Sequence, residues 1–234
     1  PREKPGPVDV AALVKMPNEA SHAAKLYEIE RGSLLRTYTV HAPIRTERLR
    51  KFDGDWLAAL KTVDFEKISP AAREELIALR SKVEDNAKDV NRRAAQAEAV
   101  APLIPFAATI IELEESRRRV DQVDAIKSAA KVDVLRKQVE KLKSAVEAGS
   151  KSAVEAGSKS GKYPAELHVD KWRAGKAAEA ATALRANLKT WNGFYTAYDP
   201  DFTWWVAEPY RTADLALEAY IKALKEAEKN ATEP

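Results

Sequence analysis

Apolar side chains recur every three or four positions over most of the chain after residue 19, which is the spacing of one helix face. One such stripe is formed by Leu49, Phe52, Trp56, Leu60 and Val63. Further stripes run through residues 19–38, 76–100 and 123–148, and through a segment that ends near residue 195. The pattern predicts long amphipathic helices.

Prolines mark where these helices begin and end. Ser69 followed by Pro70 is typical of a helix start, because the serine can cap and proline at the first position forfeits no hydrogen bond. Pro102 and Pro105 should end the helix that begins at Pro70, since proline lacks a backbone donor. The dipeptide Asp199-Pro200 should separate the last two helices.

The predicted fold class is all-α, an antiparallel, bundle-like array of about seven helices. Only 8 Gly occur, which argues against strands joined by tight hairpins. We expect residues 1–18 to form an extended arm and residues 19–234 to form one helical domain. The octapeptide SAVEAGSK occurs twice in succession, at 144–151 and 152–159. We interpret 144–161 as a tolerant surface connection.

Composition excludes several kinds of site. The 39 Lys and Arg nearly balance the 36 Asp and Glu, so charge gives no reason to expect nucleic acid as a partner. No apolar run reaches the 18 or so residues of a membrane helix. With no Cys, the chain has no disulfide, thiolate nucleophile or cysteine-ligated zinc.

No catalytic or metal-binding motif is complete. The three histidines are His22, His41 and His168, and only Glu19 and His22 have the spacing of helical metal ligands. The sequence contains no His-Glu-x-x-His, nucleophile elbow or phosphate-binding loop. We therefore expect no catalytic residue, no metal ligand and no cofactor of its own in this chain.

One segment of the chain, residues 112–121, combines acidic residues with an arginine triplet. They are Glu112, Glu114, Glu115, Arg117, Arg118, Arg119 and Asp121. One hypothesis is an anion-binding site, and the other is a helix surface with ion pairs three and four residues apart. We favour the ion pairs.

Aromatic residues gather between positions 191 and 210. The cluster comprises Trp191, Phe194, Tyr195, Tyr198, Phe202, Trp204, Trp205 and Tyr210. These side chains either lock two helices and their connection together or line a ligand or peptide cleft. The structural interpretation is favoured for most of them, with Tyr198, Trp204, Trp205 and Tyr210 as candidates for a cleft. Because Trp204 and Trp205 are adjacent, we expect one to be buried and the other to face a groove.

Three segments resemble a known family. They are RLRKFDGDWLAAL at 48–60, APLIPFAATIIE at 101–112 and YDPDFTWWVAEPY at 198–210. In order and spacing they are similar to the N-terminal part of the bacterial "domain of unknown function" family numbered 885. That resemblance implies a largely helical, exported protein similar to zinc metallopeptidases, whose His-Glu metal motif lies in the C-terminal part. Nothing in this chain matches that motif.

The resemblance leaves two principal hypotheses. In the first, the chain is the N-terminal helical region of an exported zinc-metallopeptidase-like protein and contributes a structural or substrate-cleft wall. A C-terminal catalytic half would then supply the zinc site, and the substrate would be peptide-like. In the second, the chain is a free-standing helical interaction module without enzymatic activity.

Overall fold

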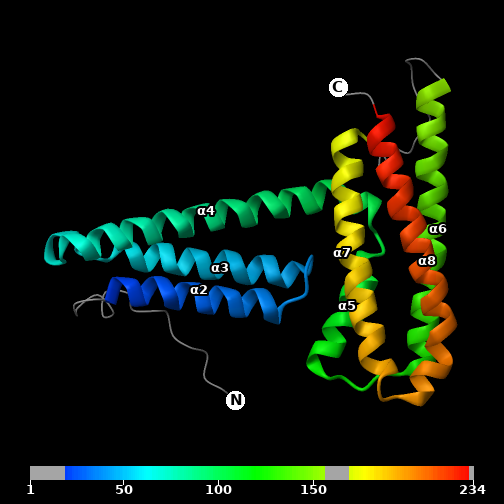
Figure 1. Cartoon of the computed structure of the whole chain (residues 1–234), viewed down its shortest axis with the longest axis horizontal. Helices are drawn as coiled ribbons and strands as arrows, with labels where there is room; N and C mark the ends of the chain where they lie inside the picture. The colour runs from blue at the N-terminus through cyan, green and yellow to red at the C-terminus, as the bar shows by residue number, and fades with distance from the viewer. Residues whose placement is uncertain (1–18, 156–168, 232–234) are drawn as a thin grey trace. The chain divides into compact units, whose positions relative to one another are not determined.

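The computed structural model describes residues 19–155 and 169–231, and these form helices joined by short connections (Figure 1). Within them are seven α-helices, two short 3₁₀ segments and no strand, which confirms the all-α prediction. The α-helices are α2 (Glu19–Thr37), α3 (Pro43–Lys61), α4 (Pro70–Val100), α5 (Ala107–Arg119), α6 (Ala125–Glu155), α7 (Lys171–Thr196) and α8 (Pro200–Asn230). The 3₁₀ segments are Phe65–Lys67 and Ala101–Leu103.

The described residues divide into two compact units. Unit 1 holds residues 19–38 and 42–95, and unit 2 holds residues 39–41, 96–155 and 169–231. The division falls inside α4, whose amphipathic pattern continues without a Pro, a Gly or a change of composition. A helix that passes from one unit to the next leaves no boundary signal in the sequence.

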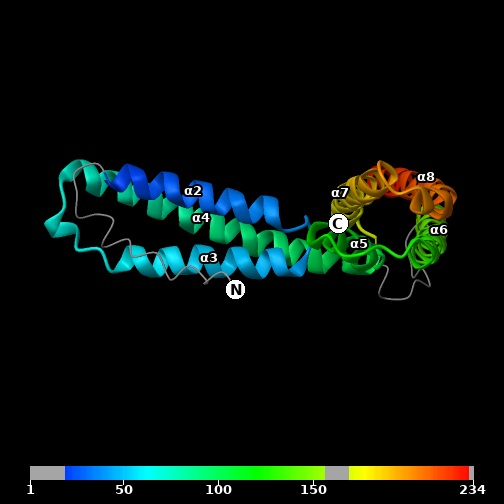
Figure 2. The same ribbon diagram turned by 90° about the horizontal axis from the view of Figure 1, so that it is seen from below.

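Unit 1 packs α2, α3 and most of α4 side by side (Figures 1 and 2). The core contains Tyr27, Trp56, Leu60, Leu76 and Val83, all nearly or fully buried. The ring of Tyr27 meets Trp56 edge-on at 5.4 Å between centroids. The stripe predicted for 49–63 therefore does face a core.

The start of α4 follows the predicted capping chemistry. The Ser69 hydroxyl accepts a hydrogen bond from the Ala72 backbone N–H at 3.2 Å, and Pro70 is the first helical residue. Capping satisfies one of the N–H groups that the first turn leaves without an intrahelical partner. The helix ends at Val100, two residues before Pro102.

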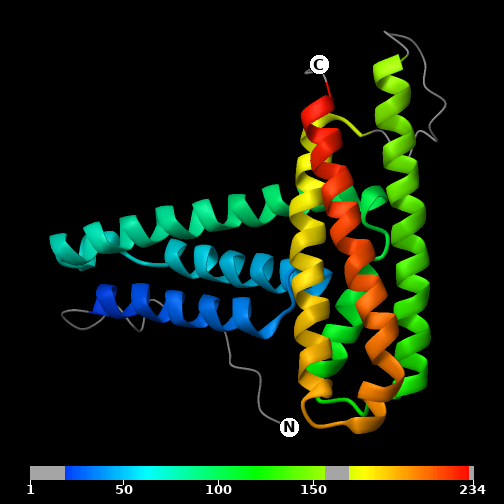
Figure 3. The same ribbon diagram turned by 45° about the vertical axis from the view of Figure 1, so that its right-hand side comes forward.

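Unit 2 is built around α8, which packs against both α6 and α7, while α5 packs against α7 (Figure 3). Its core includes Leu135 from α6, Leu184 and Leu188 from α7, and Leu217 and Tyr220 from α8. Several alanines of α7 and α8, such as Ala177 and Ala213, are also buried. Small residues at such positions let the two helices approach closely.

The tandem octapeptide does not begin a surface connection at 144. Helix α6 continues to Glu155, so the first copy is helical and Val146 is buried in the core of unit 2. The Ala, Glu and Lys of the repeat are strong helix formers, which explains why the helix continues through it. Residues 156–161 of the expected connection and the predicted arm at 1–18 lie outside the described residues.

No single helix in the described ranges is long and apolar enough to cross a bilayer. One bent pair, Pro70–Leu103 with Ala107–Arg118, meets the criteria of length and composition only when the two segments are taken together.

Candidate functional site

The candidate site lies in unit 2, where the chain turns from α7 into α8. The amides of Tyr198 and Asp199 both donate to the Tyr195 carbonyl, at 3.1 and 2.9 Å, and close the end of α7. The Asp199 carboxylate then accepts the Phe202 N–H at 2.9 Å and caps α8, with Pro200 as its first residue. The predicted helix break is therefore a two-helix corner with a defined cap.

Three buried aromatic rings support this corner from inside. Trp191 and Tyr195 of α7 and Phe202 of α8 are each 3 % exposed or less. Phe202 lies 5.1 Å from Trp191 and 5.0 Å from Tyr195 between ring centroids. Burial raises the pKa of the Tyr195 hydroxyl above its ordinary value. These residues lock the helices together, as the structural interpretation of the cluster predicted.

The aromatic contacts continue outward to the surface. Phe194 meets Tyr195 and Tyr198 edge-on, at 5.1 and 5.3 Å between centroids. The guanidinium of Arg117, from the end of α5, lies 5.2 Å from the centre of the Phe194 ring, which is a cation–π distance. The exposed ring of Tyr198 is thus held in place by its contacts with Phe194 and Tyr195.

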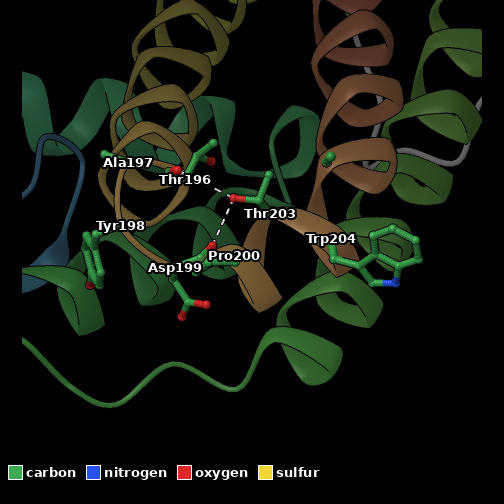
Figure 4. A pocket seen from close by; sticks show the side chains of 8 residues that line it. Thr196, Ala197, Tyr198, Asp199, Pro200, Thr203 and Trp204 are labelled. Atoms are coloured by element: carbon green, nitrogen blue, oxygen red, sulfur yellow. Dashed lines mark hydrogen bonds between the residues drawn. The ribbon is translucent and has the colours of Figure 1, made fainter.

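An open hollow of about 550 Å³ adjoins this corner, and we call it the aromatic hollow. Its lining consists of Thr196, Ala197, Tyr198, Asp199, Pro200, Thr203, Trp204 and Ala207. The Thr203 hydroxyl of α8 donates to the carbonyl of the capping residue Asp199 at 2.9 Å and lies 3.5 Å from the Thr196 carbonyl of α7 (Figure 4). Tyr198 and Trp204 lie on either side of the turn formed by Asp199 and Pro200 (Figure 4).

The structure brings together two of the four cleft candidates. Tyr198 and Trp204 line the hollow, and their exposed fractions are 60 % and 82 %. Trp205 is not among the lining residues, and Tyr210 is partly buried against the core of unit 2. Burial also raises the pKa of the Tyr210 hydroxyl above its ordinary value.

The expectation that one of the adjacent tryptophans is buried is wrong. Trp205 is 48 % exposed and Trp204 is 82 % exposed, so both reach solvent. The buried positions on this turn of α8 belong to Phe202 and Val206, which lie four residues apart and face the core. Trp204 is two residues from each of them and so lies on the opposite face of α8, whereas Trp205 lies at the edge of the buried stripe.

Apart from Tyr198 and Trp204, the lining residues of the hollow were not predicted from the sequence. Pro200, Thr203, Trp204 and Ala207 are spaced three, one and three residues apart, which places them on one face of α8. That spacing was a usable signal once the helix start at Pro200 was recognised. The contribution of Thr196 and Ala197 from α7 needed the tertiary structure.

The acidic residues and arginine triplet form ion pairs rather than an open anion site. Glu114 is 1 % exposed and pairs with Arg117 at 2.7 Å and with Arg118 at 3.0 Å. Arg119 pairs with Asp121 at 2.8 Å. The favoured ion-pair interpretation of this segment is confirmed for these residues.

Among the described residues, no group of three or more His, Asp or Glu side chains is placed to hold a metal ion. His22 lies exposed on α2 in unit 1, whereas His168 lies outside the described residues.

Neither the family models, nor the curated proteins, nor the solved structures gave a match to this chain.

Proposed function

We propose that this chain is a helical binding region whose aromatic hollow forms one wall of a peptide-binding cleft. The observation that carries the proposal is the group of exposed aromatic side chains at the α7–α8 corner. Tyr198 and Trp204 flank the hollow, and Phe194 and Trp205 are also exposed there. Tyr and Trp are enriched at binding surfaces because they bury a large area at little cost in conformational entropy.

The form of the hollow favours a peptide-like ligand. It is shallow and widely open to solvent, and its lining comes from the end of one helix and the start of another. Such a surface suits an extended chain whose side chains reach the hollow in turn. The buried layer of Trp191, Tyr195 and Phe202 holds the binding surface in place before a ligand arrives, which reduces the entropic cost of binding.

The larger context of the proposal is an exported, zinc-metallopeptidase-like protein. It rests on the resemblance of residues 48–60, 101–112 and 198–210 to the N-terminal part of the family numbered 885. The last of these segments contains Tyr198, Asp199, Pro200, Thr203 and Trp204, and so supplies most of the hollow. In this proposal the C-terminal half of the protein brings the zinc site, and this chain positions the peptide.

Binding of a set of blocked decapeptides of varied sequence tests the proposal. We expect saturable binding to the unmodified chain and a loss of about tenfold or more in affinity for Trp204→Ala, since hot-spot aromatics at interfaces have effects of this size. Trp172→Ala is the matched control, because Trp172 is also exposed but lies at the opposite end of α7. Equal affinity in both variants, or no binding to the unmodified chain, contradicts the proposal.

The second candidate is a free-standing interaction module. The observation that favours it is the division into two units, each with its own hydrophobic core. Isolation of the protein from its native source separates the two candidates. A longer chain or a bound partner carrying a His-Glu zinc motif supports the metallopeptidase-like protein, whereas a lone chain of this mass supports the module.

A further inference from the structure

The charge around the aromatic hollow differs from that of the rest of the chain. Lys and Arg make up 39 of the 234 residues, yet none occurs between Lys189 and Arg211. The same stretch contains three acidic residues, Asp199, Asp201 and Glu208. Glu208 pairs with Arg211 at 2.6 Å, which leaves the two aspartates to set the charge beside the hollow.

These two aspartates are exceptional in the described part of the chain. Ten of its twelve aspartates form ion pairs, and the two that form none are Asp199 and Asp201. The paired ones are Asp53, Asp55, Asp64, Asp85, Asp89, Asp121, Asp124, Asp133, Asp170 and Asp214. The chain thus pairs its aspartates almost everywhere except beside the exposed aromatic rings.

Stabilisation of the helix start accounts for only part of this charge. A helix N-terminus is equivalent to about half a positive charge, and one capping aspartate already exceeds it. Helix α7 shows the ordinary arrangement, in which Asp170 caps the helix and also pairs with Arg173 at 3.7 Å. Helix α8 has Asp199 as its cap and Asp201 in its first turn, so a net negative charge remains.

The position of the carboxylates relates this charge to the aromatic rings. Asp199 lines the hollow between Tyr198 and Trp204 (Figure 4). Asp201 precedes Trp204 by three residues on α8, which makes the two side chains neighbours on the helix surface. Arg117 of α5, which contacts Phe194 at this corner, is already paired with Glu114.

We infer that the aromatic hollow binds the cationic side chain, Lys or Arg, of an extended segment from a partner protein. Aromatic faces attract cations through the ring quadrupole, and a carboxylate beside them adds Coulomb attraction. Tyr198, Trp204 and Asp199 line the hollow, and Asp201 lies beside Trp204 on the surface of α8. Charge complementarity therefore selects a basic side chain over an acidic or neutral one. This inference rests on the proposed function and specifies the ligand of the same site.

Titration with matched blocked tripeptides tests the inference. The probes are acetyl-Ala-Lys-Ala amide and acetyl-Ala-norleucine-Ala amide, which differ in the charge at the end of the central side chain. We expect the lysine peptide to bind about tenfold more tightly at low salt and to lose most of that advantage at high salt. Binding is followed by tryptophan fluorescence.

The double variant Asp199→Asn with Asp201→Asn removes the two negative charges in and beside the hollow. Asparagine caps helices about as well as aspartate, so α8 should keep its start. We expect this variant to bind the lysine peptide about as weakly as the norleucine peptide. Asp170→Asn, a cap substitution at the start of α7, should leave the affinity unchanged.

The outcomes separate this inference from the proposed function. Equal binding of the two tripeptides, or undiminished lysine binding by the double Asn variant, overturns the inference but leaves a neutral peptide site. A lack of binding by either tripeptide and by all decapeptides overturns both. If the double Asn variant instead abolishes self-association measured by sedimentation, a second copy of this chain occupies the hollow and the inference of a partner protein is wrong.

Discussion

The Tyr220 hydroxyl of α8 donates a hydrogen bond to the backbone carbonyl of Leu103 at 2.6 Å, 117 residues earlier in the chain. Both residues are buried, and the Tyr220 ring also meets Phe106 edge-on at 6.0 Å between centroids. One side chain of α8 therefore holds the connection between α4 and α5 against the core of unit 2. This carbonyl belongs to the 3₁₀ segment that the prolines create, so it depends on a side-chain donor.

Tyr220→Phe should destabilise unit 2 by about 1–3 kcal/mol near pH 8, because it leaves a buried carbonyl without its donor. The packing of the ring is retained, so the fold should persist. Urea unfolding followed by circular dichroism measures the change. A loss below the experimental error would contradict this role of the hydroxyl.

The cost of Tyr220→Phe should decrease at alkaline pH. Burial raises the pKa of the Tyr220 hydroxyl above its ordinary value near 10. As the pH rises above 10, the unfolded chain releases the proton while the folded chain retains it, so the unmodified protein loses stability that the Phe variant retains. At pH 11 the difference between the two proteins should be smaller by about 1 kcal/mol than at pH 8. A difference that is constant with pH would refute the argument.

Phe202 and Trp204 should respond very differently to truncation. Phe202 is fully buried between Trp191 and Tyr195, so Phe202→Ala should cost about 3–5 kcal/mol. Trp204 is 82 % exposed, and Trp204→Ala should change the free energy of unfolding by no more than about 0.5 kcal/mol. Chemical denaturation compares the two. A large loss for Trp204→Ala would mean that this ring is part of the core.

Asp53 should be the most sensitive charged residue of unit 1. Its buried carboxylate accepts hydrogen bonds from the Tyr27 hydroxyl at 2.8 Å and from Arg31 Nε at 3.1 Å. Asp53→Asn leaves the mostly buried Arg31 without a counter-charge, and breaking such a pair costs about 3–5 kcal/mol. Hydrogen exchange of the α2 and α3 amides reports the loss within unit 1.

The exposed Asp55 supplies the control for Asp53. It pairs with Lys51 on the surface of the same helix, and such pairs contribute about 0–1 kcal/mol. Asp55→Asn should therefore leave the exchange rates almost unchanged. Similar effects of the two substitutions would show that the buried network around Asp53 does not stabilise unit 1.

Two glycines within helices are expected to weaken the fold. Space around Gly54 in α3 and Gly193 in α7 is open, since an added Cβ meets no atom within 4 Å at either position. Replacement by Ala should stabilise the protein by about 0.5–1 kcal/mol at each site. At Gly175 the new Cβ would lie 2.5 Å from Glu228 Oε1, so Gly175→Ala should gain less. Thermal unfolding ranks the three variants, and a larger gain at Gly175 than at Gly193 would contradict this explanation.

Most of the helices could be predicted from the sequence, because the apolar stripes are long and local residue signals mark the helix ends. Ser69 and Pro70 start α4 and Asp199 and Pro200 start α8 as the sequence indicated. The division into units was not visible, since α4 passes through it without a break. At the octapeptide repeat the sequence suggested a surface connection from residue 144, but the helix-forming Ala, Glu and Lys of the repeat continue α6 to Glu155.

The candidate site was only partly predictable from the sequence. The aromatic cluster indicated Tyr198 and Trp204 as cleft candidates, and both line the hollow. Periodicity on α8 would have distinguished the buried Phe202 and Val206 from the exposed tryptophans, had the helix start been used to set the register. Which aspartates of the described residues form ion pairs, and that Asp199 and Asp201 form none, depends on tertiary contacts that a single sequence does not specify.

Indole N–H signals in nuclear magnetic resonance test most directly whether the α7–α8 corner is a binding surface. The chain has 5 Trp, and each gives one signal that single Trp→Phe variants assign. On titration with acetyl-Ala-Lys-Ala amide, we predict a saturable shift of the Trp204 signal, while the signals of the buried Trp56 and of Trp172 at the far end of α7 stay in place. A Trp204 signal that stays in place, or equal movement of all five signals, would contradict a peptide-binding site at the aromatic hollow.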